Sequence, residues 1–240
     1  MTQLSEPEKA HLKAVFNALP RERIRFYLEA SSRNPYEALR RYDWNSKLSS
    51  ALFETIGHFE VDLRTTIDAA LTERHIFKKR SGDWLDNAHD ELSERAGEAL
   101  AKAREDAIAN RRTGHGDHQS GRGHVIAELN FSFWRRLLDR RYEQSHGSAI
   151  MRRYPDLRRL GTTNADMSPL RDLVEPIYAL RNRIAHHEPV WRLSWRQRNE
   201  DMLRLIRASS PELASWVEKK CRLGEVAAMN PAAPPTGHRS

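Results

Sequence analysis

The sequence lacks the features that mark several large classes of protein. It contains one cysteine, Cys221, among 240 residues, which excludes an intrachain disulfide framework and a cysteine-based zinc cluster. No run approaches the roughly 18 consecutive apolar residues of a transmembrane helix, and the N-terminus has no apolar stretch typical of a signal peptide. We therefore expect a cytoplasmic protein with no membrane partner.

Signals for β-structure are equally scarce, whereas helix signals recur. Neither Asn-Gly nor Asp-Gly occurs, but Ser5 and Glu8 have the spacing of a capping box, and Asn34 before proline is a typical helix start. Apolar residues then recur at gaps of three or four over roughly 28 residues. They are Trp44, Leu48, Leu52, Ile56, Phe59, Leu63, Ile67 and Leu71. Gly57 inside this stripe suggests close packing of a neighbouring helix, or a kink.

The rest of the chain also favours helices, except for a glycine-rich segment at 113–124 that predicts a loop. The histidines of that segment, His115, His118 and His124, have no cysteine or clustered carboxylates beside them, so we expect no metal site there. Further helices are expected at 88–112, 124–142, 168–188, 195–208 and 211–222. The sequence predicts an all-α bundle of about seven or eight helices, with little or no strand. We expect one domain over residues 1–222 and a disordered tail over 223–240.

Positive charge is concentrated between residues 134 and 160. The chain has 40 Lys and Arg against 33 Asp and Glu, a net charge of +7, which favours anionic partners. Eight arginines form the doublets Arg135-Arg136, Arg140-Arg141, Arg152-Arg153 and Arg158-Arg159. With Trp134, Tyr142 and Tyr154 available for stacking, this segment is a candidate RNA-contacting surface, to which Arg183 would add. The alternative is an ordinary solvated helix face.

The residues most able to carry chemistry gather at the end of the helix expected at 168–188. They are Arg181, Asn182, Arg183, His186 and His187. Cleavage of RNA without a metal needs a group that takes the proton of the ribose 2′-hydroxyl and a group that protonates the leaving 5′-oxygen. Histidine can do either near neutral pH, and a guanidinium can stabilise charge on the phosphate. The alternative is that these side chains only cap the helix carbonyls.

The ideal helix also predicts how such a site would be completed. Arg181 and His186 would lie about 7.5 Å apart along the axis and about 140° apart around it. A single helix therefore does not aim both groups at one phosphate. We expect a second copy of the motif, or another helix, to complete the site.

The spacing Arg-Asn-x-x-x-His, from Arg181 to His186, resembles the signature of HEPN domains. Three segments resemble the Abi-like (abortive infection) branch of bacterial proteins, within about residues 36–192; they are 42–64, 126–134 and 180–191. The resemblance implies an all-helical HEPN-like fold and a role in phage defence or in a toxin–antitoxin system. It also implies a metal-independent, cofactor-free endoribonuclease that leaves 2′,3′-cyclic phosphate ends.

Carried over residue by residue, the resemblance implies that Arg181 stabilises the phosphate, Asn182 orients the site and His186 is the acid or base. His187 is the alternative acid or base, because the superfamily tolerates longer spacings. The implied partners are RNA, a second copy of the chain with its motif facing the first, and an antitoxin or regulatory RNA.

Three further residues are expected to support the motif. Glu60 and Arg64 lie four apart, which favours an ordinary ion pair, but Glu60 is alternatively expected to pair with Arg181 or His186. Glu60 or Glu188 is expected at the dimer interface, where positive charge needs a counter-charge. Two other functions stay open: a non-catalytic HEPN-like dimer that binds RNA or a nucleotide, and a protein-interaction module of a defence system.

Overall fold

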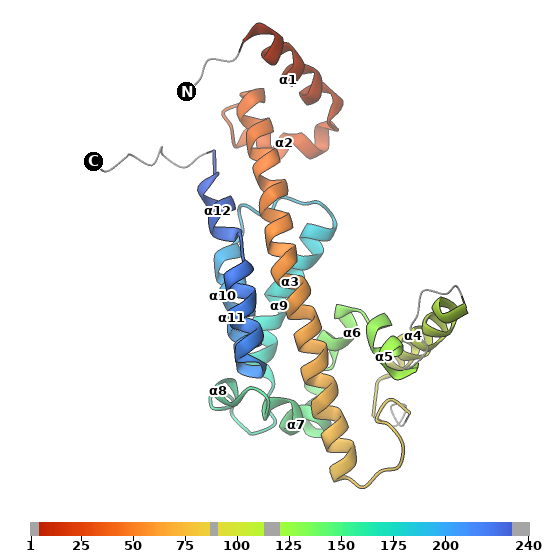
Figure 1. The fold of residues 1–240 in the computed structure, drawn as a ribbon. Coiled ribbons are helices and arrows are strands. Elements are labelled where there is room, and N and C mark those ends of the chain that lie inside the picture. The colour runs from red at the N-terminus through yellow and green to blue at the C-terminus, as the bar shows by residue number, and fades with distance from the viewer. Residues whose placement is uncertain (1–4, 87–90, 113–120, 232–240) are drawn as a thin grey trace. The chain divides into compact units, whose positions relative to one another are not determined.

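The computed structural model describes residues 5–86, 91–112 and 121–231, which are helical with no strand among them (Figure 1). The helices are α1 (Glu6–Ala18), α2 (Arg21–Glu29), α3 (Pro35–Phe77), α4 (Glu94–Arg112), α5 (Gly121–Glu128), α6 (Phe131–Arg136), η2 (Arg140–Tyr142), η3 (Glu143–Gly147), α7 (Ser148–Met151), α8 (Pro155–Arg158), α9 (Ser168–Ala185), α10 (Trp195–Ser209), α11 (Pro211–Lys220) and α12 (Leu223–Ala228). Eight helices of the described part have eight residues or more, so the expected all-α fold is confirmed. No helix in these ranges is long and apolar enough to cross a membrane.

The chain forms two compact units, each assembled from separate stretches of sequence. The first unit comprises Met1–Thr55, Leu180–Arg196 and Lys220–Ser240. The second comprises Ile56–Ala179 and Gln197–Lys219. Helices α3 and α9 therefore contribute residues to both units, and the expected single domain over 1–222 stays a prediction.

The N-terminal helices of the first unit begin where the sequence predicts. The Glu8 carboxylate accepts a hydrogen bond from the Ser5 backbone N–H at 2.8 Å, at the start of α1. The Asn34 Oδ1 accepts from the backbone N–H of Tyr36 (3.0 Å) and of Glu37 (3.3 Å), at the start of α3. The core of this part is a cluster of four buried residues, Ile24, Tyr27, Ala38 and Leu39.

The apolar stripe of α3 is buried along its whole length. All eight predicted stripe residues, from Trp44 to Leu71, are at most 5% exposed. Each large apolar side chain buried in this way stabilises the fold by about 1.5–3 kcal/mol. The helix itself is longer than the stripe, with 43 residues from Pro35 to Phe77.

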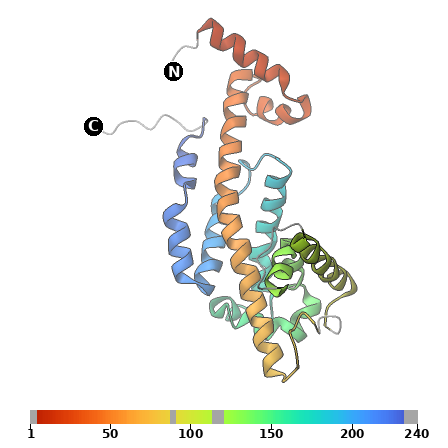
Figure 2. The same ribbon diagram turned by 45° about the vertical axis from the view of Figure 1, so that its right-hand side comes forward.

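Residues 121–142 depart from the expected structure in two places. Helix α5 begins inside the predicted loop 113–124, because Arg122 is held by ion pairs with Asp68 (2.7 Å) and Asp83 (2.5 Å). The remainder of that loop, 113–120 with His115 and His118, lies outside the described residues. Figure 2 shows α5 beside α4, as does Figure 1.

The helix expected over 124–142 is interrupted at Asn130. The Asn130 Oδ1 accepts from the Phe133 backbone N–H at 3.1 Å, which ends the α5 segment and caps a new helix, α6. The prediction of one continuous helix there was wrong because a capping asparagine interrupts the apolar pattern.

The prediction of a disordered tail from residue 223 was wrong for its first residues. Leu223 and Val226 are buried in α12, and the Trp44 Nε1 donates to the Val226 carbonyl at 2.7 Å. Burial of two apolar residues against the first unit therefore orders a short helix that composition alone does not reveal. Residues 232–240 lie outside the described part.

A buried carboxyl in the second unit makes stability depend on pH. Asp62 of α3 is 7% exposed, and both its oxygens lie 2.7 Å from the Ser209 Oγ. Burial raises the pKa of Asp62 from 3.8 to about 6, although the Ser209 hydroxyl opposes the shift. The folded carboxyl thus holds its proton more tightly than the unfolded one. Its contribution to stability is complete below pH 3.8 and is lost as pH rises to 6.

We therefore expect Asp62→Asn to raise the free energy of unfolding by about 2–3 kcal/mol at pH 7.5, and by little at pH 4. The asparagine oxygen still accepts from Ser209. Urea unfolding of both proteins at the two pH values measures the difference. A variant whose advantage is the same at both values would contradict the assignment.

Candidate functional site

The predicted motif lies at the C-terminal end of α9, within the first unit. Arg181, Asn182 and Arg183 occupy the last turns of the helix, and the residues on either side of them, Leu180 and Ile184, are buried. The helix was expected to continue to about residue 188 but ends at Ala185. Leu180 and Ile184 therefore anchor the end of the helix in the core, whereas His186 and His187 lie beyond it.

His186 and His187 form the turn that terminates the helix. The Glu188 N–H donates to the Arg183 carbonyl (2.8 Å) and the His187 N–H to the Ile184 carbonyl (2.9 Å), which is the Schellman pattern. His187 has φ 55°, in the left-handed region that glycine or asparagine normally occupies. A β-carbon there costs about 1–2 kcal/mol. The same turn ends α3, where Lys79 has φ 53°, so this backbone conformation by itself does not mark a functional residue.

The guanidinium of Arg23, on α2, holds this turn from outside the helix. Its Nη1 donates to the carbonyl of His186 (3.1 Å) and to that of His187 (2.5 Å). Carbonyls at a helix end have no partner within the helix, so the guanidinium satisfies two of them. Both histidine side chains remain exposed while their backbone is fixed.

Helix α3 holds the segment that follows. The buried Asn45 Oδ1 accepts from the backbone N–H of Val190 (2.9 Å) and of Trp191 (3.3 Å). The guanidinium of Arg41 lies 4.9 Å from the centre of the Trp191 ring. Arg23 of α2 therefore holds the turn itself, and Asn45 of α3 holds the segment that follows it.

The charged residues of the motif differ in their surroundings. Arg181 is half-buried, and its buried Nε has no hydrogen-bond partner among the described residues. Asn182 is also half-buried, whereas Arg183 is exposed and its Nε lies 3.1 Å from the Glu188 Oε2. Glu188, expected to support the site, therefore pairs with a motif arginine.

A cleft of about 560 Å³ opens beside the turn. Residues of α2, α3 and the end of α9 line it, and His187 is among them whereas His186 is not. Burial raises the pKa of the Tyr27 hydroxyl, which also lines the cleft, to about 12, so this hydroxyl stays uncharged. The volume is within the range of small-molecule binding sites.

Glu60 and Arg64 belong to the second unit, whereas the motif belongs to the first. Both are half-buried, and no ion pair joins them among the described residues, so the ordinary intrahelical pair is not formed. The expected pairing of Glu60 with Arg181 or His186 stays a prediction.

The arginine doublets of the second unit are unequally available to a ligand. Arg140, Arg141, Arg152 and Arg159 are exposed, and Arg159 lies 3.2 Å from the Asp156 carboxylate. Arg135 pairs with Glu175, and Arg153 pairs with Glu73. Arg136 is half-buried. Arg140, Arg141 and Arg152, which are exposed and form no ion pair among the described residues, are the better candidates for phosphate contacts.

The aromatic residues expected to stack on RNA bases are not available for it. Trp134, Tyr142 and Tyr154 are at most 3% exposed. The Trp134 ring packs against Phe133 at 5.2 Å and its Nε1 donates to the Leu129 carbonyl. This part of the sequence prediction was wrong, because these rings form core rather than surface.

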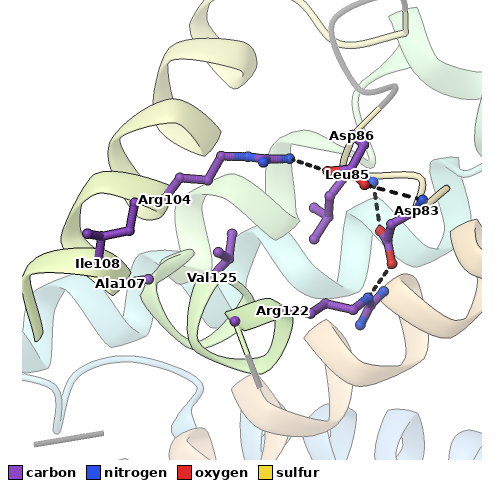
Figure 3. Close-up of a pocket in the computed structure, with 9 residues that line it drawn as sticks. Asp83, Leu85, Asp86, Arg104, Ala107, Ile108, Arg122 and Val125 are labelled. Carbon is purple, nitrogen blue, oxygen red and sulfur yellow. Dashed lines mark hydrogen bonds and ion pairs between the residues drawn. The ribbon is translucent and has the colours of Figure 1, made fainter. Parts of the chain in front are cut away.

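The second unit has its own pocket, of about 450 Å³, shown in Figure 3. Its charged groups pair with one another: Arg104 with Asp86 at 3.0 Å, and Arg122 with Asp83 at 2.5 Å. The Arg104 guanidinium holds the pKa of Asp86 below its usual range. Because these charged groups neutralise one another in pairs, we expect a charged ligand to bind this pocket less readily than the motif.

Sequence reasoning identified the motif residues but missed Arg23 and the cleft. No local pattern marks Arg23, which lies 163 positions before His186. Its role depends on a tertiary contact. Within the described ranges, no three His, Cys, Asp or Glu residues gather as they would around a metal ion.

Comparison with known proteins gives one match. The family model described as Abi-like protein matches residues 22–192, from α2 to the residue after Trp191. No curated protein and no solved structure matches the chain significantly. The matched range includes Arg23, the cleft and the complete motif. Because the match covers most of its length, the chain belongs to the Abi-like family.

Proposed function

We propose that this protein is an endoribonuclease effector of an abortive-infection or toxin–antitoxin system, with its chemistry at the end of α9. The Abi-like family suggests a protein of an abortive-infection system. The observation that carries the proposal is the turn itself. Two exposed imidazoles follow a buried helix, their backbone is fixed by Arg23, and one of them is kept at a positive φ.

The chemistry follows from these residue types. In the proposed reaction a neutral imidazole takes the proton of the 2′-hydroxyl, and the 2′-oxygen attacks the adjacent phosphorus. The bond from phosphorus to the 5′-oxygen breaks, and a protonated imidazole gives that oxygen a proton. His186 is proposed as one of the two groups and His187 as the other. Arg181 stabilises the charge of the transition state and Asn182 orients the site.

We expect purified protein to cleave single-stranded RNA in EDTA, leaving 2′,3′-cyclic phosphate and 5′-hydroxyl ends. Gel electrophoresis with end-group analysis measures this. Activity that disappears with the chelator and returns with Mg²⁺ or Mn²⁺ would contradict the mechanism. A mobility shift without cleavage would favour an RNA- or nucleotide-binding dimer, and neither effect a protein-interaction module.

The proposal includes a homodimer in which the two motifs face each other. Arg181 and His186 diverge on their own helix, so one subunit's arginine and its partner's histidine would share a phosphate. Exposed Arg140, Arg141 and Arg152 are proposed to contact the RNA backbone, and an antitoxin or regulatory RNA to control the enzyme.

Light scattering should therefore give about twice the chain mass of 27.8 kDa at micromolar concentration. Mixing inactive Arg181→Ala protein with inactive His186→Ala protein should restore part of the activity, because a heterodimer contains one intact composite site. A monomer that cleaves RNA at full rate would refute the shared site.

A further inference from the structure

We infer that Arg41 and Arg192, whose guanidiniums lie against the ring of Trp191, form a binding site for a phosphate group of an RNA strand. The site would hold a phosphate that flanks the cleaved one, and its residues are separate from those proposed to react. That the phosphate belongs to RNA rests on the proposed function, whereas the anion site itself is argued from the contacts of these three residues.

The two guanidiniums converge on one indole ring. The Arg41 guanidinium, on α3, lies 4.9 Å from the centre of the Trp191 ring, and the Arg192 guanidinium lies 4.6 Å from the same centre. All three residues belong to the first unit. Two positive charges are thereby held as close neighbours, and their mutual repulsion costs free energy unless an anion is bound beside them.

Neither of these guanidiniums has a counter-charge within the protein. Among the described residues, no carboxylate forms an ion pair with Arg41 or with Arg192. Four other cations of the same unit do have such partners: Arg40 pairs with Glu37, Lys47 with Asp43, Arg183 with Glu188 and Arg222 with Glu54. The two guanidiniums at Trp191 are therefore a local excess of positive charge, which attracts an anion.

Both guanidiniums also keep unused hydrogen-bond donors. A guanidinium has five N–H donors. Within the described ranges, Arg41 uses one of them, in a long bond of 3.4 Å from its Nε to the Ser31 Oγ, and Arg192 uses none. The contact with the ring restrains both side chains, so less rotamer freedom is lost when an anion binds. A phosphate, with several acceptor oxygens, is the group that such forked donors bind well.

The place of this pair in the chain puts it near the proposed reaction. Trp191 is four residues after His187, so their α-carbons are at most about 14 Å apart. The Asn45 Oδ1 fixes the end of this segment by accepting from the backbone N–H of Val190 and of Trp191. A strand whose reacting phosphate lies at the histidine turn can therefore place another phosphate at the two arginines. Such a contact would fix how the strand crosses the turn.

The salt dependence of RNA binding tests the site apart from catalysis. A fluorescein-labelled oligomer of 2′-O-methyl uridine has no free 2′-hydroxyl to react, and fluorescence anisotropy with the full-length protein gives its affinity at about 50–200 mM NaCl. Each phosphate contact with a single strand contributes about 0.7 to the slope of log K against log salt concentration. Arg41→Gln and Arg192→Gln should each lower the slope by about 0.7 and weaken binding about 5-fold at 0.1 M salt. The double variant should lower the slope by about 1.4 and weaken binding about 25-fold.

Arg40→Gln is the matched control. It removes the same charge from the adjacent residue of α3, but the Arg40 guanidinium is already paired with Glu37 at 3.1 Å. Its affinity should stay within about 2-fold of the original, with an unchanged slope. An oligomer of 2′-O-methyl adenosine should show the same losses as the uridine oligomer, because a phosphate contact does not read the base. Circular dichroism checks that each variant is folded, and the exposure of Arg192 makes its substitution compatible with folding.

Each outcome decides the inference. An unchanged slope in both single variants, an equal loss in Arg40→Gln, losses that differ between the two oligomers, or no binding of either oligomer would overturn it. Binding of a labelled oligoglutamate through the two arginines in place of RNA would also overturn it, because the site would then take the carboxylates of a protein.

The same measurements separate this site from the proposed nuclease. If the slope falls as expected while unmodified RNA stays intact, the phosphate site stands and the proposed nuclease fails. If unmodified RNA is cleaved and the slope of the double variant is unchanged, the nuclease stands and the phosphate site fails.

Discussion

Removal of either motif imidazole is expected to lower RNA cleavage by about 100- to 10,000-fold, the usual contribution of a positioned acid or base. The structure dictates which substitution tests each residue cleanly. His186 is exposed and has ordinary backbone geometry, so His186→Ala removes only the side chain. His187 has φ 55°, where alanine would keep the strain, so His187→Gly is the better variant.

The two variants should be folded, which separates chemistry from stability. We expect His186→Ala to change the free energy of unfolding by less than about 0.5 kcal/mol. His187→Gly should raise it by about 1 kcal/mol, because glycine adopts the left-handed conformation freely. An inactive protein that is more stable than the original would be strong support for a functional role.

His11→Ala is the matched control, since His11 is an exposed histidine of the same unit outside the motif. It should cleave RNA at the original rate. If His187→Gly retains more than about a tenth of the activity, His187 has no part in proton transfer. If His186→Ala does so, the role passes to His187 alone.

Replacement of Gly147 by alanine is expected to destabilise the second unit by about 3 kcal/mol or more. Gly147 is buried at the end of η3, and a β-carbon there would lie 2.1 Å from the Ala165 carbonyl oxygen and 2.9 Å from its carbon. Both are backbone atoms, so relief requires moving the chain rather than turning a side chain. Thermal unfolding should show a Tm lower by about 6–12 °C.

Gly57→Ala provides the opposite result on the same measurement. Apart from its own helix backbone, no heavy atom of the described residues lies within 4 Å of a β-carbon at Gly57, so the close packing suggested by its place in the stripe is not seen there. Alanine in a helix interior is favoured over glycine by about 0.8–1 kcal/mol, so the Tm should rise slightly. Equal Tm values for the two variants would show that the contact with Ala165 is not maintained in solution.

Patterns in the sequence predicted the helices whose formation depends on contacts within one or two turns. The stripe from Trp44 to Leu71 is buried throughout because a period of 3.6 residues places those side chains on one face. The starts of α1 and α3 follow from capping by Ser5 with Glu8 and by Asn34, which are contacts within one turn. The existence of these helices needs no knowledge of the tertiary fold.

The predictions that were wrong concern features that depend on contacts between residues far apart in the sequence. Helix α5 begins early because Arg122 pairs with Asp68, 54 positions away, and α12 forms because its apolar residues are buried by distant segments. The three aromatics near the arginine doublets were assigned to the surface because their neighbours are charged, yet Trp134 lies in the core. Similarly, the motif could be found from its spacing, whereas Arg23 could not.

The contact made by Arg23 also means that the motif can be governed from the beginning of the chain. One guanidinium on α2 holds the carbonyls of both His186 and His187, and only residues 30–34 separate α2 from α3. A protein that binds the outer face of α2, or a protease that cuts residues 30–34, would remove the Arg23 guanidinium from the turn. The backbone carbonyls of His186 and His187 would then lose this hydrogen-bond donor together, although neither histidine is contacted. Helix α2 would thus control the conformation of the histidine turn, and a regulator that binds α2 would not need to contact the RNA.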